Sequence, residues 1–428
     1  MRRVVVTGLG AITPLGVGIR HTWARLLAGE SGIVSVAGRK PADRWNELPS
    51  TVAGLVPEGE GEGRWNAAKW LGPAEERRMA KFAQYAMAAS DMAIKDAGLE
   101  DASAADRERT GVCLGTGIGN LEEIYETGSA HGAGGYRKVE PLFVPRILPN
   151  MAAGHVSIKY GFHGPGGAAT TACTTGADSI IDAFHPISNG HANVMIAGSS
   201  ESCIHPLTFA GFGRARSLST AYNHAPRESC RPFDSKRNGF VIGEGAGVCV
   251  LEELEHAKAR GARIYAEITG YGRSMDAHHI TAPPEDGRGA YLAMRRALEM
   301  ASVRPSRVDY INAHGTGTLV GDKAEARAIR RVMLGDGGVS DESQVTVSST
   351  KGAMGHLLGG AGAVEALFAI LAVHEGMAPA TLNLESPDVG VNFNFVPLKA
   401  QERKIETSLS NSFGFGGMNS SLIFSKLR

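Results

Sequence analysis

The nonapeptide ATTACTTGA, residues 169–177, places one cysteine, Cys173, among small residues. An apolar pattern with helical spacing follows at residues 180–184, so we expect a helix to begin just after the cysteine. Free backbone N–H groups and the helix dipole at such a position favour a thiolate. We therefore expect Cys173 to be a nucleophile with a lowered pKa, although a small buried hydrophobe is the commonest role of a free cysteine.

Two further segments each place a histidine in a glycine-rich turn after a strand-like run. Residues 312–318 read NAHGTGT and contain His314, and residues 351–356 read KGAMGH and contain His356. A histidine in such a turn is often an ordinary loop residue. One thiol and two imidazoles on glycine-flanked loops together favour acyl transfer through a covalent thioester.

These three segments closely resemble those of the β-ketoacyl-acyl-carrier-protein synthases, the condensing enzymes of fatty-acid synthesis. The resemblance extends over essentially the whole chain, from RVVVTGLG at residues 3–10 to NSFGFGG at residues 411–417. The elongating type, which has a Cys-His-His trio, fits best. Such an enzyme condenses an acyl group with malonyl-acyl-carrier protein and needs no redox or organic cofactor.

Strand-like runs alternate with longer helical patterns, which predicts an α/β fold with sheets covered by helices. One helix is expected over residues 75–95, and the run at 263–272 repeats the opening strand with its Gly-x-Gly turn. The resemblance implies the thiolase fold, two duplicated α/β halves in a five-layer αβαβα sandwich. We predict an N-terminal half, residues 1–260, with the nucleophile, and a C-terminal half, residues 261–428, with both histidines.

The resemblance also implies a role for each member of the trio. Cys173 accepts the acyl chain, and its backbone N–H forms an oxyanion hole with that of Phe415. His314 and His356 donate hydrogen bonds to the enolate that forms when a malonyl thioester loses CO2, so both imidazoles should be neutral.

Other residues are assigned by the same resemblance. Lys351 matches the family's essential lysine, and we expect it to be buried and charge-paired with Glu325, with Asp322 nearby. Thr316 and Thr318 match residues that hydrogen-bond the phosphopantetheine arm, although a threonine in a turn is most often a local cap.

The acyl pocket and a cation site are also implied. Ile118 matches a position that lines the chain-length pocket, and the loop at residues 413–417, with Phe413 and Phe415, gates access to it. Oxygen-rich side chains suit a hard cation, and a plain hydrogen-bond network is the equally weighted alternative. The candidate site for a structural Na or K ion consists of Asn312, Glu365, Ser410 and Asn411.

Basic side chains suggest a docking surface for the acidic acyl carrier protein, although such residues are usually a solvated face. Arg77, Arg78 and Lys81 are expected on one helix. The candidates for docking are Arg77, Arg78, Arg137, Lys138 and Arg216. The resemblance further implies a homodimer.

Composition excludes several function classes. Formal net charge is +0, so global charge does not indicate nucleic acid. We find no continuous apolar run long enough to span a bilayer, and no signal-peptide pattern. The odd count of 5 cysteines, without metal-ligand pairing, predicts a reducing intracellular compartment. The resemblance to bacterial and mitochondrial enzymes implies the bacterial cytoplasm or the mitochondrial matrix. Glycines at 8 and 10 lack the third glycine of a dinucleotide fingerprint.

Several alternatives stay open at this point. A coenzyme A-dependent thiolase would need a second catalytic cysteine near the C-terminus, and none follows Cys249. Initiating synthases carry asparagine where His356 stands. Inactive chain-length factors usually lack the cysteine, and a non-catalytic carrier-protein scaffold need not keep the trio and Lys351. A polyketide-type ketosynthase shares the trio and remains open.

Overall fold

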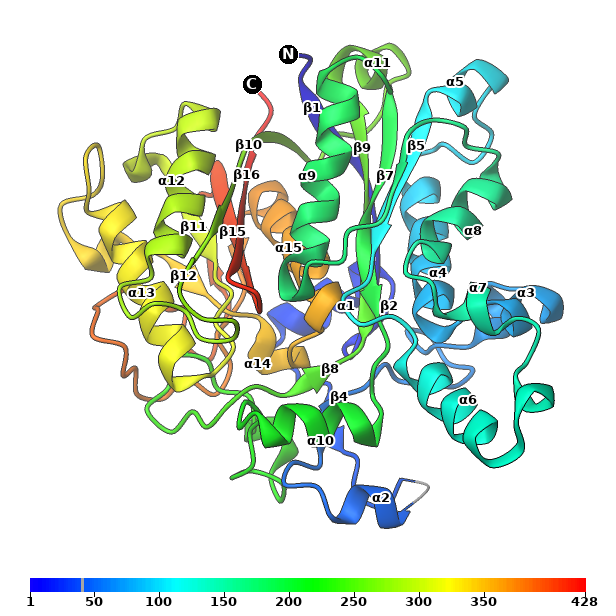
Figure 1. Ribbon diagram of the computed structural model, residues 1–428. Coiled ribbons are helices and arrows are strands. Elements are labelled where there is room, and N and C mark those ends of the chain that lie inside the picture. Colours follow the sequence, from blue (N-terminus) through cyan, green and yellow to red (C-terminus); the bar gives the residue numbers. More distant parts are fainter. Residues whose placement is uncertain (40–41) are drawn as a thin grey trace.

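The computed structural model describes residues 1–39 and 42–428 (Figure 1). Its centre is an 11-stranded sheet with the order β12-β11-β15-β16-β10-β1-β9-β7-β5-β6, and β2 (Gly16–Val17) pairs with β1 off this path. The strands are β1 (Val4–Thr13), β5 (Thr110–Gly115), β6 (Gly166–Gly167), β7 (Val194–Glu201), β9 (Gly245–Glu253), β10 (Ala266–Met275), β11 (Tyr310–Asn312), β12 (Val347–Ser348), β15 (Thr407–Gly414) and β16 (Met418–Ser425).

The strand order repeats itself about the centre of the sheet. β1 and β10 pair antiparallel there, and each is followed outward by an antiparallel strand, β9 or β16. On both sides the outer strands run parallel: β7, β5 and β6 in one half, β15, β11 and β12 in the other. The pairing register also shifts at equivalent places, between Val6 and Gly8 in β1 and between Ile268 and Gly270 in β10. The repeat expected from sequence is therefore present, while the boundary after residue 260 stays a prediction.

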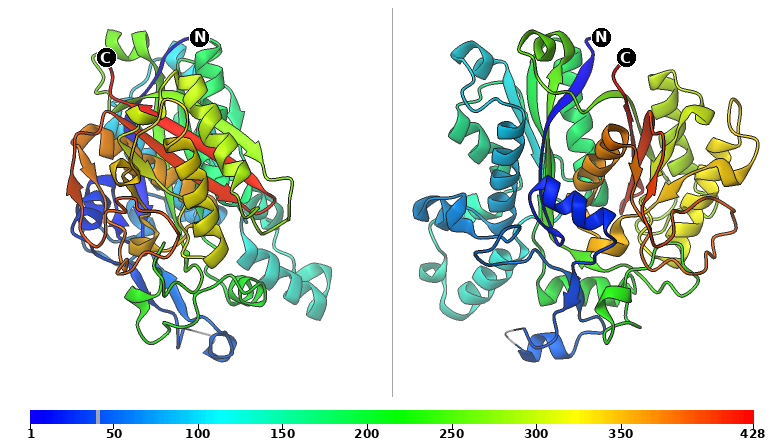
Figure 2. Two further views of the ribbon diagram at one scale, coloured as in Figure 1. Left: turned by 90° about the vertical axis from the view of Figure 1, so that its left-hand side faces the viewer. Right: turned by 180° about the vertical axis from the view of Figure 1, so that it is seen from behind.

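Helices cover both faces of each half, which gives five layers (Figure 2). The outer layer of the first half contains α4 (Lys81–Asp96) and α8 (Met151–Tyr160), which pack on β1 and β5. The middle layer contains α9 (Thr175–Ser188) and α15 (Ala361–Glu375), which contact each other and both halves of the sheet. The other outer layer contains α12 (Arg288–Ala301) and α13 (Leu319–Met333). The five-layer αβαβα prediction is confirmed.

The Gly-x-Gly pairs lie inside strands, not in the turns expected from sequence. A Cβ on Gly10 of β1 would lie 2.0 Å from the carbonyl oxygen of Ala89 in α4. A Cβ on Gly272 of β10 would lie 2.0 Å from the carbonyl oxygen of Ala293 in α12. These glycines let an outer helix approach each central strand, which is a packing role and not a nucleotide-binding one.

The helix expected over residues 75–95 is two helices. α3 (Pro73–Arg78) ends where Met79 and Ala80 turn into the core in extended conformation, and α4 begins at Lys81. Burial of Met79 and Ala80 outweighs the continuous helical pattern, because an extended dipeptide turns these side chains inward. Arg77 and Arg78 therefore do not share a helix with Lys81.

One helical segment is long and apolar enough to span a bilayer, although none was expected from the sequence. The helical residues Leu358–Glu375 have a mean hydropathy of 1.4 over 18 residues, long and apolar enough to cross a bilayer by composition. However, 89% of this segment is buried inside the protein, where α15 fills the middle layer. Its composition is thus that of a central core helix, packed by protein on all sides.

The remaining elements connect these layers or lie around the edge that carries the site. They are α1 (Ile19–Leu27), β3 (Ile33–Ser35), α2 (Ala42–Asn46), β4 (Val52–Gly54), α5 (Ala104–Glu108), α6 (Leu121–Gly134), α7 (Phe143–Ile147), α10 (Pro206–Arg214), β8 (Ile242–Gly243), α11 (Leu254–Ala259), α14 (Lys351–Met354), β13 (Met377–Ala378) and β14 (Gln401–Glu402).

Candidate active site

Cys173 lies in a single 3-10 turn, Ala172–Thr174, immediately before α9. The prediction that a helix begins just after the cysteine is confirmed. Ala172 has a φ of 51°, a left-handed conformation that is uncommon for a residue with a side chain. The nucleophile candidate is therefore presented on a strained turn at the N-terminus of a central helix.

Both histidines reach Cys173 from the second half. His314 follows β11, and His356 lies between α14 and α15 with its N–H and C=O bonded to Val241 and Gly243. His356 Nε2 lies 3.0 Å from the Cys173 sulfur, and the two imidazole ring centroids are 5.2 Å apart at 86°. The trio predicted from three separate segments is brought together.

The trio lines a cavity of about 490 Å³, a size typical of small-molecule sites. Eight of the other residues singled out in the sequence border the same cavity. They are Ile118, Arg216, Thr316, Thr318, Asp322, Glu325, Phe413 and Phe415.

The electrostatics of the two imidazoles match the neutral state expected of them. Burial, together with the positive charge of Lys351, lowers the pKa of both His314 and His356 well below the usual value. Their Nδ1 atoms find no hydrogen-bond partner within residues 1–39 and 42–428. At neutral pH both rings are therefore uncharged. Each neutral ring keeps one N–H, which can donate a hydrogen bond to a developing oxyanion.

The lowered pKa expected for the Cys173 thiol is wrong. Burial raises the pKa of the Cys173 thiol to about 12, although the charge of Lys351 and the Phe415 backbone N–H act in the opposite direction. Cys173 packs against an apolar cluster that includes Leu358, and its desolvation outweighs the opposing effects of Lys351 and Phe415. His356 is the group placed to take the thiol proton.

The charge partner expected for Lys351 is also wrong. Lys351 is completely buried, as predicted, but its ammonium pairs with Glu365 of α15, not with Glu325. Glu325 instead accepts the backbone N–H groups of His314 and Gly315, at 2.8 and 2.7 Å. Because Glu325 lies on α13, which begins just after this loop, its carboxylate faces back onto the loop backbone.

Asp322 has the same orientation. Its carboxylate accepts the N–H groups of Thr316 and Gly317, both at 3.1 Å, and that of Phe233 at 2.7 Å. The two acids of α13 therefore fix the conformation of the loop that carries His314, Thr316 and Thr318. They support the loop rather than pair with Lys351.

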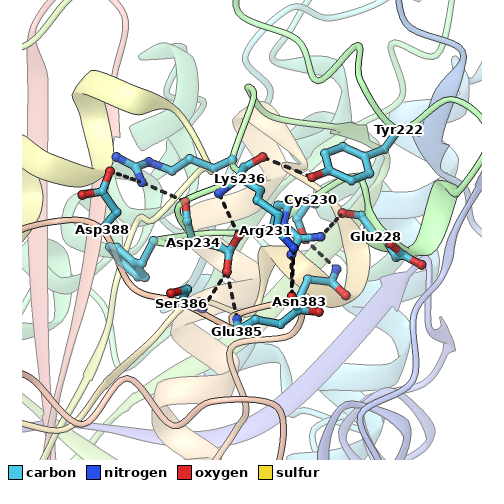
Figure 3. A network of polar contacts seen from close by, with 12 residues as sticks. Tyr222, Glu228, Cys230, Arg231, Asp234, Lys236, Asn383, Glu385, Ser386 and Asp388 are labelled. Atoms are coloured by element: carbon cyan, nitrogen blue, oxygen red, sulfur yellow. Dashed lines mark hydrogen bonds and ion pairs between the residues drawn. The ribbon is translucent and has the colours of Figure 1, made fainter.

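Figure 3 shows a second polar network, which includes Arg231 and Asp234. Arg237 connects this network to the loop. Arg237 donates to the carbonyl oxygens of Asp234, Thr318 and Leu319, at 2.8, 3.3 and 3.2 Å. The Asp234 carboxylate in turn accepts Arg231 Nε at 3.0 Å. Arg237 and Asp234 thereby connect the loop after Thr316 to residues 238–240, which line the cavity.

Sequence reasoning missed Glu201, at the end of the buried strand β7. Its carboxylate accepts the Thr116 hydroxyl at 3.0 Å and the N–H groups of Gly117 and Gly359 at 3.0 and 3.1 Å. Burial raises the pKa of Glu201 to about 7. It holds the loop of Ile118 against the segment after His356. The sequence signal for Glu201 was a lone acid at the end of the strand-like run VMIAGSSE.

The four cation-site candidates are buried and are not among the residues that line the cavity. Asn312 of β11 pairs in register with Ser410 of β15, and Asn411 follows. The Asn312 Oδ1 and Glu365 Oε2 atoms are buried and have no hydrogen-bond partner in the part of the chain that the structure describes. Two unsatisfied oxygens suit a hard monovalent cation, although Lys351 already occupies the other oxygen of Glu365.

The basic docking candidates are all exposed but do not form one group. Arg216 borders the cavity of the trio, Arg77 and Arg78 lie on α3, and Arg137 and Lys138 follow α6. Arg77 also borders a second cavity of about 1330 Å³. The acids around that cavity are Glu58, Glu60, Glu76, Glu122, Glu123, Glu126 and Glu140. Their charge weakens the attraction of Arg77 for an acidic partner.

Comparison with known proteins identifies the family. Residues 1–257 match the model for the β-ketoacyl synthase N-terminal domain, and residues 265–385 match that for its C-terminal domain. The chain belongs to the β-ketoacyl synthase family. Within this family it is similar to a mitochondrial 3-oxoacyl-acyl-carrier-protein synthase of Arabidopsis thaliana, 51% identical over 437 residues, 100% of this chain and 94% of the relative.

A bacterial family member is almost equally similar. 3-oxoacyl-acyl-carrier-protein synthase 2 of Rhizobium meliloti is 50% identical over 425 residues, 99% of this chain and 98% of the relative. Among solved structures, a ketosynthase complex titled as a type II PKS acyl-carrier protein with its ketosynthase has a TM-score of 0.88 at 31% identity, with 100% of both chains covered. The thiolase fold expected from the motifs is confirmed.

Proposed function

We propose that this chain is an elongating β-ketoacyl-acyl-carrier-protein synthase of fatty-acid synthesis. The observation that carries the proposal is the contact between Cys173 Sγ and His356 Nε2, at 3.0 Å, beside a second neutral imidazole, His314. A nucleophile with an adjacent base serves acyl transfer, and two neutral donors serve enolate chemistry. A polyketide-type ketosynthase is the second candidate, because the ketosynthase of the PKS complex is 31% identical over the whole chain.

The first half-reaction loads the acyl group onto Cys173. The sulfur attacks the carbonyl carbon of the acyl thioester, and its proton moves to His356 Nε2. The backbone N–H groups of Cys173 and Phe415 stabilise the tetrahedral oxyanion. The C–S bond to pantetheine then breaks, and the departing thiolate takes up the proton, so that His356 is neutral again.

The second half-reaction uses the donors of both imidazoles. The bond between the carboxylate and the methylene carbon of malonyl thioester breaks, CO2 leaves, and the electron pair moves onto the thioester oxygen. His314, as its Nε2–H tautomer, donates to this enolate. His356 carries its proton on Nδ1 after acylation, so it donates to the enolate from Nε2 only once that proton has moved from Nδ1 to Nε2. Its carbon attacks the acyl-Cys173 carbonyl, and the C–S bond to Cys173 breaks. The sulfur is reprotonated from solvent.

Lys351 acts on these steps through electrostatics. Its ammonium is buried and lowers the pKa of each imidazole. Lys351 thus keeps both imidazole rings neutral, and each neutral ring can donate one hydrogen bond. In this proposal Asn312, Glu365, Ser410 and Asn411 hold a structural monovalent cation, which would neutralise the buried oxygens beside this pair.

The proposed partner is an acyl carrier protein that presents acyl and malonyl groups. Thr316 and Thr318 border the cavity and line the route of the phosphopantetheine arm, with Ile118 and Phe413 at the acyl end. Arg216 is the docking residue nearest to this route, because it borders the same cavity. The names of the relatives that mention acyl carrier protein support this assignment.

We further propose a homodimer. Several large apolar side chains around α6 and α7 are exposed, and β6 leaves the outer edge of the sheet without a further strand among the described residues. A second copy would cover both features. The exposed side chains are Ile124, Tyr136, Leu142, Val144 and Leu148. Light scattering of the purified protein at micromolar concentration tests this, and a monomer mass excludes it.

The proposed compartment is the mitochondrial matrix or the bacterial cytoplasm. Relatives of both kinds match over nearly the full chain, and the five cysteines are free thiols, as a reducing compartment favours. Fractionation of the source cells tests the assignment.

The function is tested by intact-protein mass spectrometry after incubation with acyl carrier proteins of graded chain length. One acyl adduct that maps to Cys173, absent in Cys173→Ser, is the expected result. No adduct with any chain length overturns the proposal and points to coenzyme A thioesters, which the same assay then examines.

A further inference from the structure

Asp178 lies in the first turn of α9, and its side chain is buried. Its Oδ2 atom accepts the hydroxyl of Thr171 at 2.6 Å and that of Thr174 at 2.8 Å. These threonines flank Cys173, two residues before it and one residue after it. One carboxylate oxygen therefore ties together both ends of the turn that carries the nucleophile.

The other oxygen of Asp178 is bound by the second half of the molecule. Its Oδ1 atom accepts Arg273 Nε of β10 at 2.6 Å and the Ser420 hydroxyl of β16 at 2.7 Å. Arg273 Nη2 also donates to the backbone oxygen of Asp178 at 2.8 Å. With four donors on two oxygens, all the lone pairs of the carboxylate are used.

The turn that Asp178 ties is the strained one. Ala172, between Thr171 and Cys173, has the left-handed φ of 51°. A residue with a Cβ persists in this conformation only when its surroundings fix it. The two threonine hydroxyls and their shared acceptor are contacts of this kind, on either side of the strained residue.

Asp182 is a second acid that binds Arg273, and it serves as a comparison for Asp178. Asp182, one helical turn further along α9, accepts the same Arg273 Nη2 at 2.7 Å, but its side chain is 45% exposed. It binds the same guanidinium without a contact to the turn. A role that depends on the turn must belong to Asp178, and one that depends on the arginine pair must belong to both acids.

We propose that Asp178 is a positioning residue for acyl transfer. Through Thr171 and Thr174 it holds the turn that aims Cys173 Sγ at His356 Nε2, and through Arg273 and Ser420 it fixes this turn against the half that supplies the histidines. The inference rests on the proposed role of Cys173 as acyl acceptor.

The consequence is a defect in one half-reaction only. Misplacement of a reacting atom by about 1 Å costs about 100-fold in rate. The decarboxylation donors, His314 and His356, are held by other contacts, to Glu325 and to Val241 and Gly243. Loss of Asp178 should therefore slow acylation of Cys173 and spare decarboxylation of malonyl-acyl-carrier protein.

The test compares Asp178→Ala and Asp178→Asn with the matched control Asp182→Asn in the full-length protein. The acylation rate constant at saturating acyl-carrier protein is measured by intact mass, and decarboxylation is measured without acyl donor. We expect about a 10- to 100-fold slower acylation for Asp178→Ala, a KM within about twofold, and an intermediate rate for Asp178→Asn, whose amide keeps one acceptor. Asp182→Asn should stay within about twofold in both assays.

Substitutions of Thr171 test the same contact and do not depend on whether Asp178→Ala folds. Thr171→Val keeps the shape and removes the donor, whereas Thr171→Ser keeps the donor, so the first should slow acylation and the second should restore most of the rate. Equal losses in acylation and decarboxylation, or equal effects of the Asp178 and Asp182 variants, overturn the inference. Wild-type protein that is not acylated at Cys173 contradicts the proposed function itself, whereas an acylated wild type matched by Asp178→Ala contradicts the positioning role alone.

Discussion

Lys351 and Glu365 form an ion pair whose two side chains are 0% and 1% exposed. The charge of Lys351 lowers the pKa of both His314 and His356. Burial raises the pKa of Glu365 to about 7, and the neighbouring ammonium opposes this rise. The Glu365 carboxylate thus balances the positive charge of Lys351, while the field of the ammonium still acts on His314 and His356.

Substitutions of Lys351 should distinguish its contribution to the free energy of unfolding from its contribution to condensation. Lys351→Met leaves the Glu365 carboxylate buried and unpaired, which costs about 3–5 kcal/mol in the free energy of unfolding. It should also abolish condensation, because the imidazoles then protonate more readily. The double variant Lys351→Met/Glu365→Gln removes the unpaired charge and should regain most of the stability, measured by urea unfolding, without regaining condensation. Wild-type decarboxylation and condensation rates in Lys351→Met contradict this role.

The depressed pKa values of His314 and His356 set the acid limb of activity. An unfolded chain binds a proton on each histidine below about pH 6.5, whereas the folded protein does not. Stability is therefore lost as pH falls below about 6.5. Decarboxylation should stay constant down to below this pH, because both rings remain neutral donors. The pH–rate profile of decarboxylation tests this, and in Lys351→Met the acid limb should move upward. A wild-type limb centred at pH 6.5 or above contradicts the assignment.

The Cys173 thiol should remain protonated through the neutral range. Burial raises its pKa to about 12, so the thiolate fraction rises about tenfold for each pH unit below that value. The second-order rate of alkylation by iodoacetamide should therefore increase steadily from pH 6 to 9 without a plateau. Cys173→Ser gives the background from the four other cysteines, each of which is buried. A plateau below pH 8.5 would show that the helix N-terminus outweighs burial after all.

Local sequence patterns predicted an α/β class and marked the trio, whereas the thiolase fold followed from the family resemblance. The apolar spacing after Cys173 gives the start of α9, and glycine-flanked turns after strands mark His314 and His356. The partner of Lys351 was not predictable, because Glu325 and Glu365 both follow the loops concerned, and only the packing of α15 decides between them.

Contacts between the two halves lie further beyond the reach of the sequence. Asp178 is four residues from Thr174, but its other partners, Arg273 and Ser420, are 95 and 242 residues away. No periodicity connects such positions. The pKa of Cys173 was misjudged for a related reason, because the helix N-terminus is a local feature and the apolar surroundings come from several segments.

Docking of the carrier protein should depend unequally on the basic residues. Charge reversal at an exposed pair changes the free energy of binding by up to about twice the 0.2–1 kcal/mol of such a pair, which is about two- to thirtyfold in KM. Arg216→Glu should have the largest effect because Arg216 borders the cavity, and Arg77→Glu the smallest because glutamates surround Arg77. Arg137→Glu should raise the KM for carrier-protein substrates and leave that for small thioesters unchanged. Lys95→Glu, at an exposed position in the last turn of α4, is the control. The differences should shrink as salt is raised, since the attraction between exposed charges is screened. Equal effects of Arg216→Glu and Lys95→Glu remove Arg216 from the docking surface.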